Sequence, residues 1–169
     1  MKREYPARPI VGVGGVVVDR GRVLLIRRGR EPMKGEWSIP GGVVELGESL
    51  GAAVRRELRE ETGLEIQPVA VLEVFDRIVR RKGRVRYHYV IVDYACRKRG
   101  GRLRPASDVR EARWVRPQDL PRYRLSPKAL RVIEEGRAFF HKARPRRAGP
   151  VINKKPLALR RPQRPGAGY

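Results

Sequence analysis

The feature that most constrains this chain is a helix whose inner stripe changes from apolar to acidic halfway along. A proline-free run of thirteen residues follows Ser49 and ends before Gly63, which predicts a helix at about 49–62 with a cap at each end. At about 100° per residue, the apolar and the acidic members of the stripe fall on one continuous face. The apolar members are Leu50, Ala53 and Val54, and the acidic members are Glu57, Glu60 and Glu61.

Carboxylates in this arrangement are unfavourable unless a positive charge lies among them. Side chains three and four positions apart on a helix repel each other when their charges are alike, and burial adds a desolvation cost. Ligands that are all oxygen select hard cations, so the stripe predicts Mg²⁺ or Mn²⁺. The alternative is a solvated helix face whose glutamates pair with Arg55, Arg56 and Arg59.

The spacing around the glutamates favours the metal. Five residues separate Gly42 from Glu48, and seven more separate Glu48 from the run Arg-Glu-Leu-Arg-Glu-Glu-Thr-Gly-Leu at 56–64. This series matches every specified position of the Nudix box, Gly-x5-Glu-x7-Arg-Glu-U-x-Glu-Glu-x-Gly-U, in which U is aliphatic. The chain therefore resembles the Nudix hydrolase family, with the box at 42–64 and a similar layout of strands and late helix over about 8–135.

The resemblance implies an α/β Nudix fold, an α/β/α sandwich with a central mixed, curved sheet. It also implies roles for residues of the box. Glu57, Glu60, Glu61 and the carbonyl of Gly41 would bind the metal, Arg56 would orient a metal-binding glutamate, and Glu48 would support that contact from the start of the helix.

The reaction that the resemblance implies is magnesium-dependent hydrolysis of a pyrophosphate bond. Electrostatic stabilisation and positioning are nearly all that phosphoryl transfer asks of a protein. Glu61 or Glu60 is the first choice for the general base, so the expected catalytic set is Glu60, Glu61, Arg56 and Glu48. Asp108 and Glu111 are alternatives, and a plain surface turn explains these two residues equally well.

Other segments predict the rest of the domain. Glycine and β-branched residues alternate with turn residues along much of the chain, which predicts strands. We expect a hairpin of strands at 10–19 and 23–26, a loop over 29–42, long strands at 69–79 and 85–95 around a basic turn, a short strand at 112–115 and a helix at 125–140.

Charge divides the chain into two parts. The 169 residues carry a formal net charge of +22, and 141–169 holds nine of the 40 Lys and Arg residues with no acid. Basic, proline-rich composition of this kind buries too little apolar area to offset the entropy of ordering. We therefore expect a Nudix domain at 1–140 and a disordered tail at 141–169 that makes non-specific contact with nucleic acid.

The cellular setting is inferred from what the sequence lacks. Cys96 is the single cysteine, so no intramolecular disulfide can form, which is typical of a reducing compartment. No apolar run approaches the roughly 20 residues of a membrane span, and the first residues do not resemble a signal peptide. These observations predict a cytoplasmic protein with no membrane contact.

Substrate is the least determined property. The long hydrophobic strand at 87–94 and the stretch at 111–115 resemble the ADP-ribose pyrophosphatase branch of the family, which favours an ADP-ribose-like substrate. Two alternatives stay open, a nucleoside triphosphate pyrophosphohydrolase and an RNA-associated protein that acts on RNA 5′ ends. Candidate substrate contacts are Arg27, Trp37 and Glu111, although core packing is the default for Trp37. Family members are often dimers, so a homodimer is a further expectation.

Overall fold

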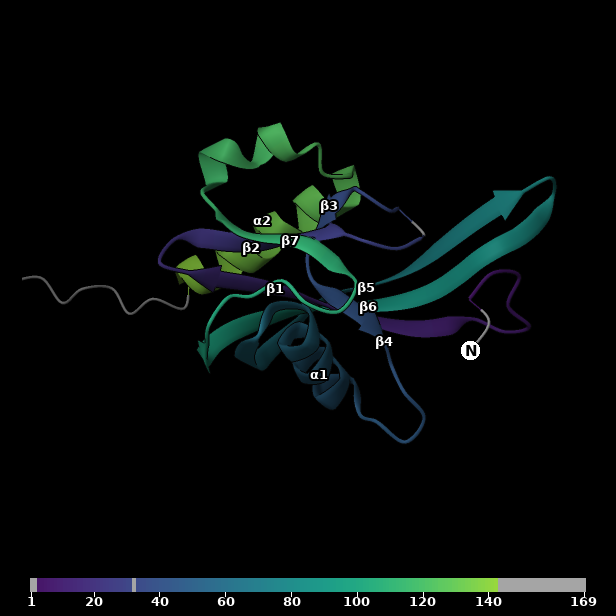
Figure 1. Cartoon of the computed structure of the whole chain (residues 1–169), viewed down its shortest axis with the longest axis horizontal. Helices are drawn as coiled ribbons and strands as arrows, with labels where there is room; N and C mark the ends of the chain where they lie inside the picture. Colours follow the sequence, from purple (N-terminus) through teal and green to yellow (C-terminus); the bar gives the residue numbers. More distant parts are fainter. Residues whose placement is uncertain (1–2, 32, 143–169) are drawn as a thin grey trace, which may run out of the picture.

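The computed structural model describes residues 3–31 and 33–142 of the chain (Figure 1). The strands are β1 (Ile10–Asp19), β2 (Arg22–Arg28), β3 (Trp37–Ser38), β4 (Gly41–Val43), β5 (Leu64–Arg81), β6 (Arg84–Gly101) and β7 (Val109–Val115). The helices are α1 (Leu50–Thr62), α2 (Pro127–Lys142) and the 3₁₀ helix η1 (Pro117–Tyr123). The expected tail lies outside the described residues from 143 onwards.

The strands form one mixed sheet. Five of them follow the order β3-β2-β1-β6-β5, while β4 pairs with β1 and β7 pairs with β2. The β1 and β6 strands are parallel, and the other pairings are antiparallel. Because β4 is held against β1, the Gly41-Gly42 dipeptide lies in the sheet rather than in a free loop.

The two α-helices cover opposite faces of this sheet. A Cβ on Gly15 would meet Leu58 of α1 at 2.9 Å, and Gly136 of α2 approaches the side chain of Val16 as closely. Adjacent strand residues point to opposite faces, so α1 and α2 lie on the two sides of β1. The observed α/β architecture confirms the expected sandwich. Neither α-helix in the described part of the chain is long and apolar enough to cross a membrane.

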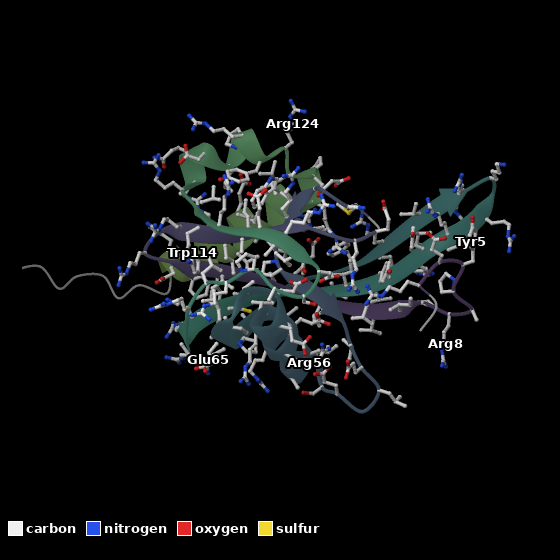
Figure 2. The ribbon with its side chains drawn as sticks, in the orientation of Figure 1. Tyr5, Arg8, Arg56, Glu65, Trp114 and Arg124 are labelled. Atoms are coloured by element: carbon white, nitrogen blue, oxygen red, sulfur yellow. The ribbon has the colours of Figure 1, made fainter. Side chains whose placement is uncertain are left out.

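A two-stranded ribbon extends from the body of the domain where the distal halves of β5 and β6 continue beyond the other strands (Figure 1). The N-terminal segment lies beside it, and the Tyr5 amide donates to the carbonyl of Arg86 at 2.8 Å. Figure 2 shows Tyr5 at this ribbon and Arg56 on α1, below the sheet in this view.

Several predicted boundaries need correction. The first long strand starts at Leu64 rather than 69 and passes through Pro68, which an edge strand tolerates because the missing N–H falls at an irregularity in the pairing. The second long strand continues to Gly101 rather than 95. Within the expected loop, β3 and β4 pair with strands distant in sequence, and η1 was not expected because its proline-rich sequence is typical of a turn.

Candidate active site

Helix α1 is fixed at both ends by the predicted caps. The Ser49 hydroxyl accepts a hydrogen bond from the Ala52 amide at 3.2 Å, and Gly63 adopts a left-handed conformation with φ of 69°. The Gly63 amide donates to the carbonyl of Arg59 at 2.8 Å. Val54 and Leu58 are fully buried against the sheet. These contacts set the rotation of the helix and therefore the direction of its glutamates.

Glu61 is the most buried carboxylate of the helix, at 4% exposure. Its Oε2 accepts a hydrogen bond from the Gly41 amide at 2.8 Å, which ties the helix to β4. Burial raises the pKa of Glu61 to about 8, and repulsion from Asp108 and Glu57 adds to the rise while the Gly41 amide opposes it. Burial therefore favours the protonated form of Glu61 when no cation is bound.

Glu57 lies one turn earlier and packs directly on Gly42. A Cβ on Gly42 would be 2.2 Å from the Glu57 carboxyl carbon, so a glycine is required for the side chain to rest there. Burial raises the pKa of Glu57, an effect that Arg56 opposes. Two adjacent glycines thus position Glu61 and Glu57, Gly41 through its amide and Gly42 through its missing side chain.

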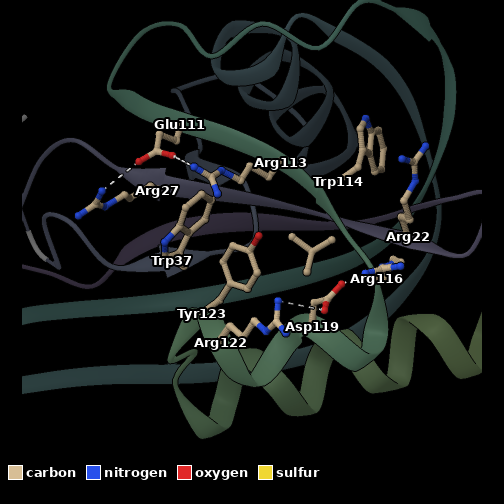
Figure 3. A pocket seen from close by; sticks show the side chains of 11 residues that line it. Arg22, Arg27, Trp37, Glu111, Arg113, Trp114, Arg116, Asp119, Arg122 and Tyr123 are labelled. Atoms are coloured by element: carbon tan, nitrogen blue, oxygen red, sulfur yellow. Dashed lines mark hydrogen bonds and ion pairs between the residues drawn. The ribbon is translucent and has the colours of Figure 1, made fainter.

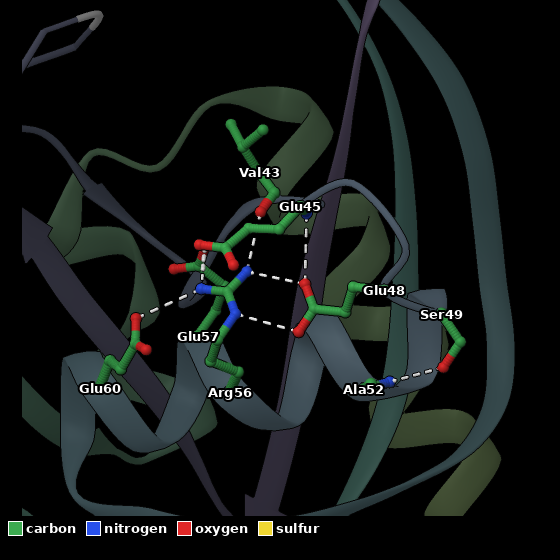
Figure 4. A network of polar contacts seen from close by, with 8 residues as sticks. All are labelled: Val43, Glu45, Glu48, Ser49, Ala52, Arg56, Glu57 and Glu60. Atoms are coloured by element: carbon green, nitrogen blue, oxygen red, sulfur yellow. Dashed lines mark hydrogen bonds and ion pairs between the residues drawn. The ribbon is translucent and has the colours of Figure 1, made fainter. Parts of the chain in front are cut away.

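Arg56 joins four groups around the start of the helix (Figure 4). Its Nε and one terminal nitrogen each donate to a different oxygen of Glu48 at 3.0 Å, and the same terminal nitrogen reaches the Val43 carbonyl. Its other terminal nitrogen donates to Glu57 at 2.9 Å and to Glu60 at 3.3 Å. The expected orienting contact from Arg56 to a site glutamate is therefore present in the geometry.

The three glutamates expected to bind metal lie on one helix face but do not converge on one point. Glu57 and Glu60 turn to Arg56, Glu61 turns to Gly41, and Glu60 is half exposed. Within the described ranges, no group of three His, Cys, Asp or Glu side chains forms a preassembled metal site. The donor chemistry nevertheless fits a hard cation, because all three side chains offer carboxylate oxygens from one helix face and burial raises the pKa values of Glu57 and Glu61.

A fourth carboxylate approaches from the loop before β7. The Ala106 amide donates to the Glu61 carbonyl at 3.1 Å, and the Gly29 amide donates to the Asp108 carbonyl at 2.6 Å. These two contacts bring Asp108 close enough for its charge to raise the pKa of both Glu57 and Glu61. The sequence indicated Asp108 only as an alternative. The role of Gly29 was missed, although a Cβ there would be 2.4 Å from the Asp108 carbonyl oxygen.

The three candidate substrate contacts come together in a separate pocket of about 550 Å³ (Figure 3). Glu111 binds Arg27 at 2.9 Å and Arg113 at 2.5 Å. Trp37 packs edge to face against Tyr123 with ring centroids 4.8 Å apart. Glu111 therefore lies with this pocket, whereas Asp108, three residues earlier, lies with the helix glutamates.

A family model, the NUDIX domain, matches residues 8–136. This chain belongs to the Nudix hydrolase family. Among curated relatives, an ADP-ribose pyrophosphatase of Methanocaldococcus jannaschii is 35% identical over 114 residues, which are 68% of this chain and 66% of the relative. A MutT-like protein of Streptomyces ambofaciens is 32% identical over 73% of this chain and 75% of the relative.

Solved structures agree with this assignment. The crystal structure of a MutT Nudix hydrolase from Burkholderia pseudomallei has a TM-score of 0.65 and 32% identity, covering 76% of this Nudix chain and 98% of the other. The Nudix domain of Shewanella oneidensis NrtR, solved with ADP ribose, shares the fold at a TM-score of 0.63 and 24% identity over 79% and 89% of the two chains. The expected family and fold are confirmed.

Proposed function

We propose that this Nudix hydrolase cleaves, with Mg²⁺, the pyrophosphate bond of a nucleoside diphosphate linked to another moiety, and that ADP-ribose is representative of its substrates. The observation that carries the proposal is the pair of carboxyl groups set on the Gly41-Gly42 dipeptide, the buried Glu61 and the half-buried Glu57. A cation bound at this place would stabilise the ionised form of both carboxyl groups and would hold a diphosphate.

The metal ligands would be Glu57, Glu60 and Glu61, with the Gly41 carbonyl as a further candidate. A bound Mg²⁺ would neutralise diphosphate charge and make a water more acidic. Arg56 acts as the positioning residue, because it binds Glu57 and Glu60 and is itself held by both oxygens of Glu48. Mn²⁺ satisfies the same oxygen donors.

The general base is one of three acids of the site, Glu61, Glu60 or Asp108. Glu61 is held by the Gly41 amide through one oxygen, which leaves its other oxygen available to accept a proton from water. Asp108 is held by its backbone, so its carboxylate is not committed to an ion pair within the described residues. We favour Glu61, with Glu60 and Asp108 as the alternatives to be separated by mutation.

We propose that one end of the pocket contacts the nucleoside part of the substrate. This end is formed by Arg27, Trp37 and Glu111. Two short segments connect this end to the glutamates, from Trp37 to Gly41 and from Asp108 to Glu111. Four residues span at most about 14 Å, so a substrate that bridges the two places is of nucleotide size. The name of the archaeal relative supports the choice of ADP-ribose.

Product analysis tests the proposal. Wild type and Glu61→Gln are incubated with Mg²⁺ and ADP-ribose, nucleotide sugars, nucleoside triphosphates or 5′-triphosphorylated RNA, and the products are separated by chromatography. Formation of AMP and ribose 5-phosphate by wild type alone supports the proposal. Release of pyrophosphate from triphosphates instead would favour the MutT-like alternative, which the Streptomyces relative supports.

A further inference from the structure

The far end of the pocket carries three arginines that the proposed hydrolysis does not use. Arg22 begins β2, and Arg116 directly follows β7. Because Val23 pairs with Val115 in the antiparallel register, Arg22 and Arg116 stand opposite each other across the two strands. Arg122 of η1 lines the same end of the pocket (Figure 3).

The positive charge at this end of the pocket is larger than the negative charge of the acidic side chain beside it. Asp119 is the single acid there, 2.8 Å from Arg116 and 3.7 Å from Arg122. Arg22 makes no ion pair with any residue of the described ranges, and the side chains of Arg116 and Arg122 are 64% and 81% exposed. Like charges directly opposite on neighbouring strands are destabilising, so an anion bound between these arginines would relieve the repulsion.

Flat surfaces lie between the arginines and the Glu111 end. Trp37 and Tyr123 form one wall of the pocket, and the Arg113 guanidinium lies over the Trp37 ring at 5.4 Å. Aromatic rings and guanidinium planes are the surfaces on which unpaired bases stack. The pocket therefore combines stacking surfaces with a separate anion site.

The length of the pocket restricts the ligand. From Glu111 to Arg116 the strand advances five residues, about 17 Å at the rise of a β-strand. A single nucleotide would occupy only part of this length, whereas several linked nucleotides would fill it. A chain of nucleotides has a phosphate at every step and exposed base faces when it is single-stranded.

We propose that this pocket binds a single strand of nucleic acid, with a base against the wall formed by Trp37, Tyr123 and Arg113 and a phosphate between Arg22, Arg116 and Arg122. The proposal concerns binding and does not depend on hydrolysis of a pyrophosphate bond. It places a nucleic-acid contact on the folded domain, separate from the basic segment after residue 142.

The test is fluorescence anisotropy of the full chain with a labelled single-stranded RNA of about ten nucleotides, a length within the usual site sizes. The RNA has a 5′-hydroxyl, so it offers no pyrophosphate bond. Each phosphate contact contributes about 0.7 to the slope of log affinity against log salt. Because the three arginines surround one phosphate, the double variant Arg116→Gln/Arg122→Gln is expected to lower that slope by about 0.7, and Arg22→Gln alone to lower it by part of that amount.

The matched control is Arg80→Gln/Arg81→Gln, which removes the same charge at the exposed end of the β5–β6 ribbon. An equal loss of slope in this control would overturn the proposal, because binding would then follow net charge alone. AMP that binds with the same dependence on the three arginines would also overturn it in favour of a mononucleotide site. Arg22→Gln keeps the test decisive if the double variant folds poorly, because Arg22 holds no ion pair in the described part of the chain.

Discussion

Arg56 donates hydrogen bonds to Glu48 from two guanidinium nitrogens, each 3.0 Å from a different carboxylate oxygen. Its remaining nitrogen donates to the glutamates of the site. The Glu45 amide donates to the same Glu48 carboxylate at 3.2 Å. The residue that orients Glu57 is therefore itself oriented from the loop before α1. Loop, helix start and site glutamates form one connected unit.

Arg56→Lys should lower kcat by about 10- to 100-fold, the usual effect of losing an outer contact to a metal ligand. Lysine keeps the charge but cannot reproduce the two-pronged contact with Glu48. Steady-state kinetics with ADP-ribose measures the effect. The control is Arg55→Lys on the exposed side of the same helix. Equal kinetics for the two variants would remove Arg56 from the site.

Without metal, the chain should lose stability as pH rises from about 4.5 to about 8. Burial raises the pKa of Glu61 to about 8, so the folded state prefers the protonated acid and that preference is lost once the acid ionises. Glu61→Gln should remove a fall on the order of 5 kcal/mol from the curve of unfolding free energy against pH. Urea unfolding across this pH window gives the curve.

In Glu61→Gln, part of the remaining fall in unfolding free energy should come from Asp93. Burial raises the pKa of Asp93 to about 7, and repulsion from Glu73 adds to the rise. Adding Asp93→Asn should flatten the curve again. A wild-type curve that rises through this window would contradict both assignments.

Mg²⁺ should raise the melting temperature more at about pH 8 than at about pH 6, because metal ligands must be deprotonated. The pKa of Glu61, which burial raises to about 8, places this competition with protons near neutral pH, and burial shifts the pKa of Glu57 in the same direction. Thermal scans with and without Mg²⁺ measure the difference, and Glu57→Gln/Glu61→Gln serves as the control. Stabilisation that is equal at both pH values would argue that the ion binds elsewhere.

Gly42→Ala should reduce activity by about 100-fold while leaving the fold largely intact, since a displacement of about 1 Å at a catalytic group has that effect. The new Cβ would lie 2.2–2.3 Å from the end of the Glu57 side chain, which is flexible and can move. Gly51→Ala on α1 meets atoms no nearer than 3.8 Å and should instead stabilise the helix by about 0.5–1 kcal/mol. Kinetics and melting temperature together separate the two effects.

Asp108→Asn should lower the pKa of Glu61, because the Asp108 charge helps to raise the pKa of Glu61. If Asp108 also accepts the proton from water, kcat should fall by about 10²- to 10⁴-fold. Glu111→Gln is the comparison, since Glu111 binds Arg27 and Arg113 in the pocket. A pH profile shifted by Glu111→Gln and untouched by Asp108→Asn would reverse these two assignments.

The sequence by itself determined the helix, its caps and the order of its acids. Ser49, Gly63 and the 3.6-residue period are local properties, so the helix from Leu50 to Thr62 could be predicted within a residue. The joint role of Arg56 and Glu48 was expected from the family resemblance, and the two residues are in contact at 3.0 Å. The spacing of the specified residues in the Nudix box also identified the family from the sequence.

Only the tertiary structure decided what surrounds these acids. Gly41 reaches Glu61 because β4 pairs with β1, and Asp108 reaches the site because backbone contacts from Gly29 and Ala106 hold its loop. The pocket of Trp37, Glu111 and Arg116 likewise exists because β2 pairs with β3 on one side and β7 on the other. Pairing between strands distant in sequence depends on the whole core, since a strand's own pattern specifies a face but not a partner.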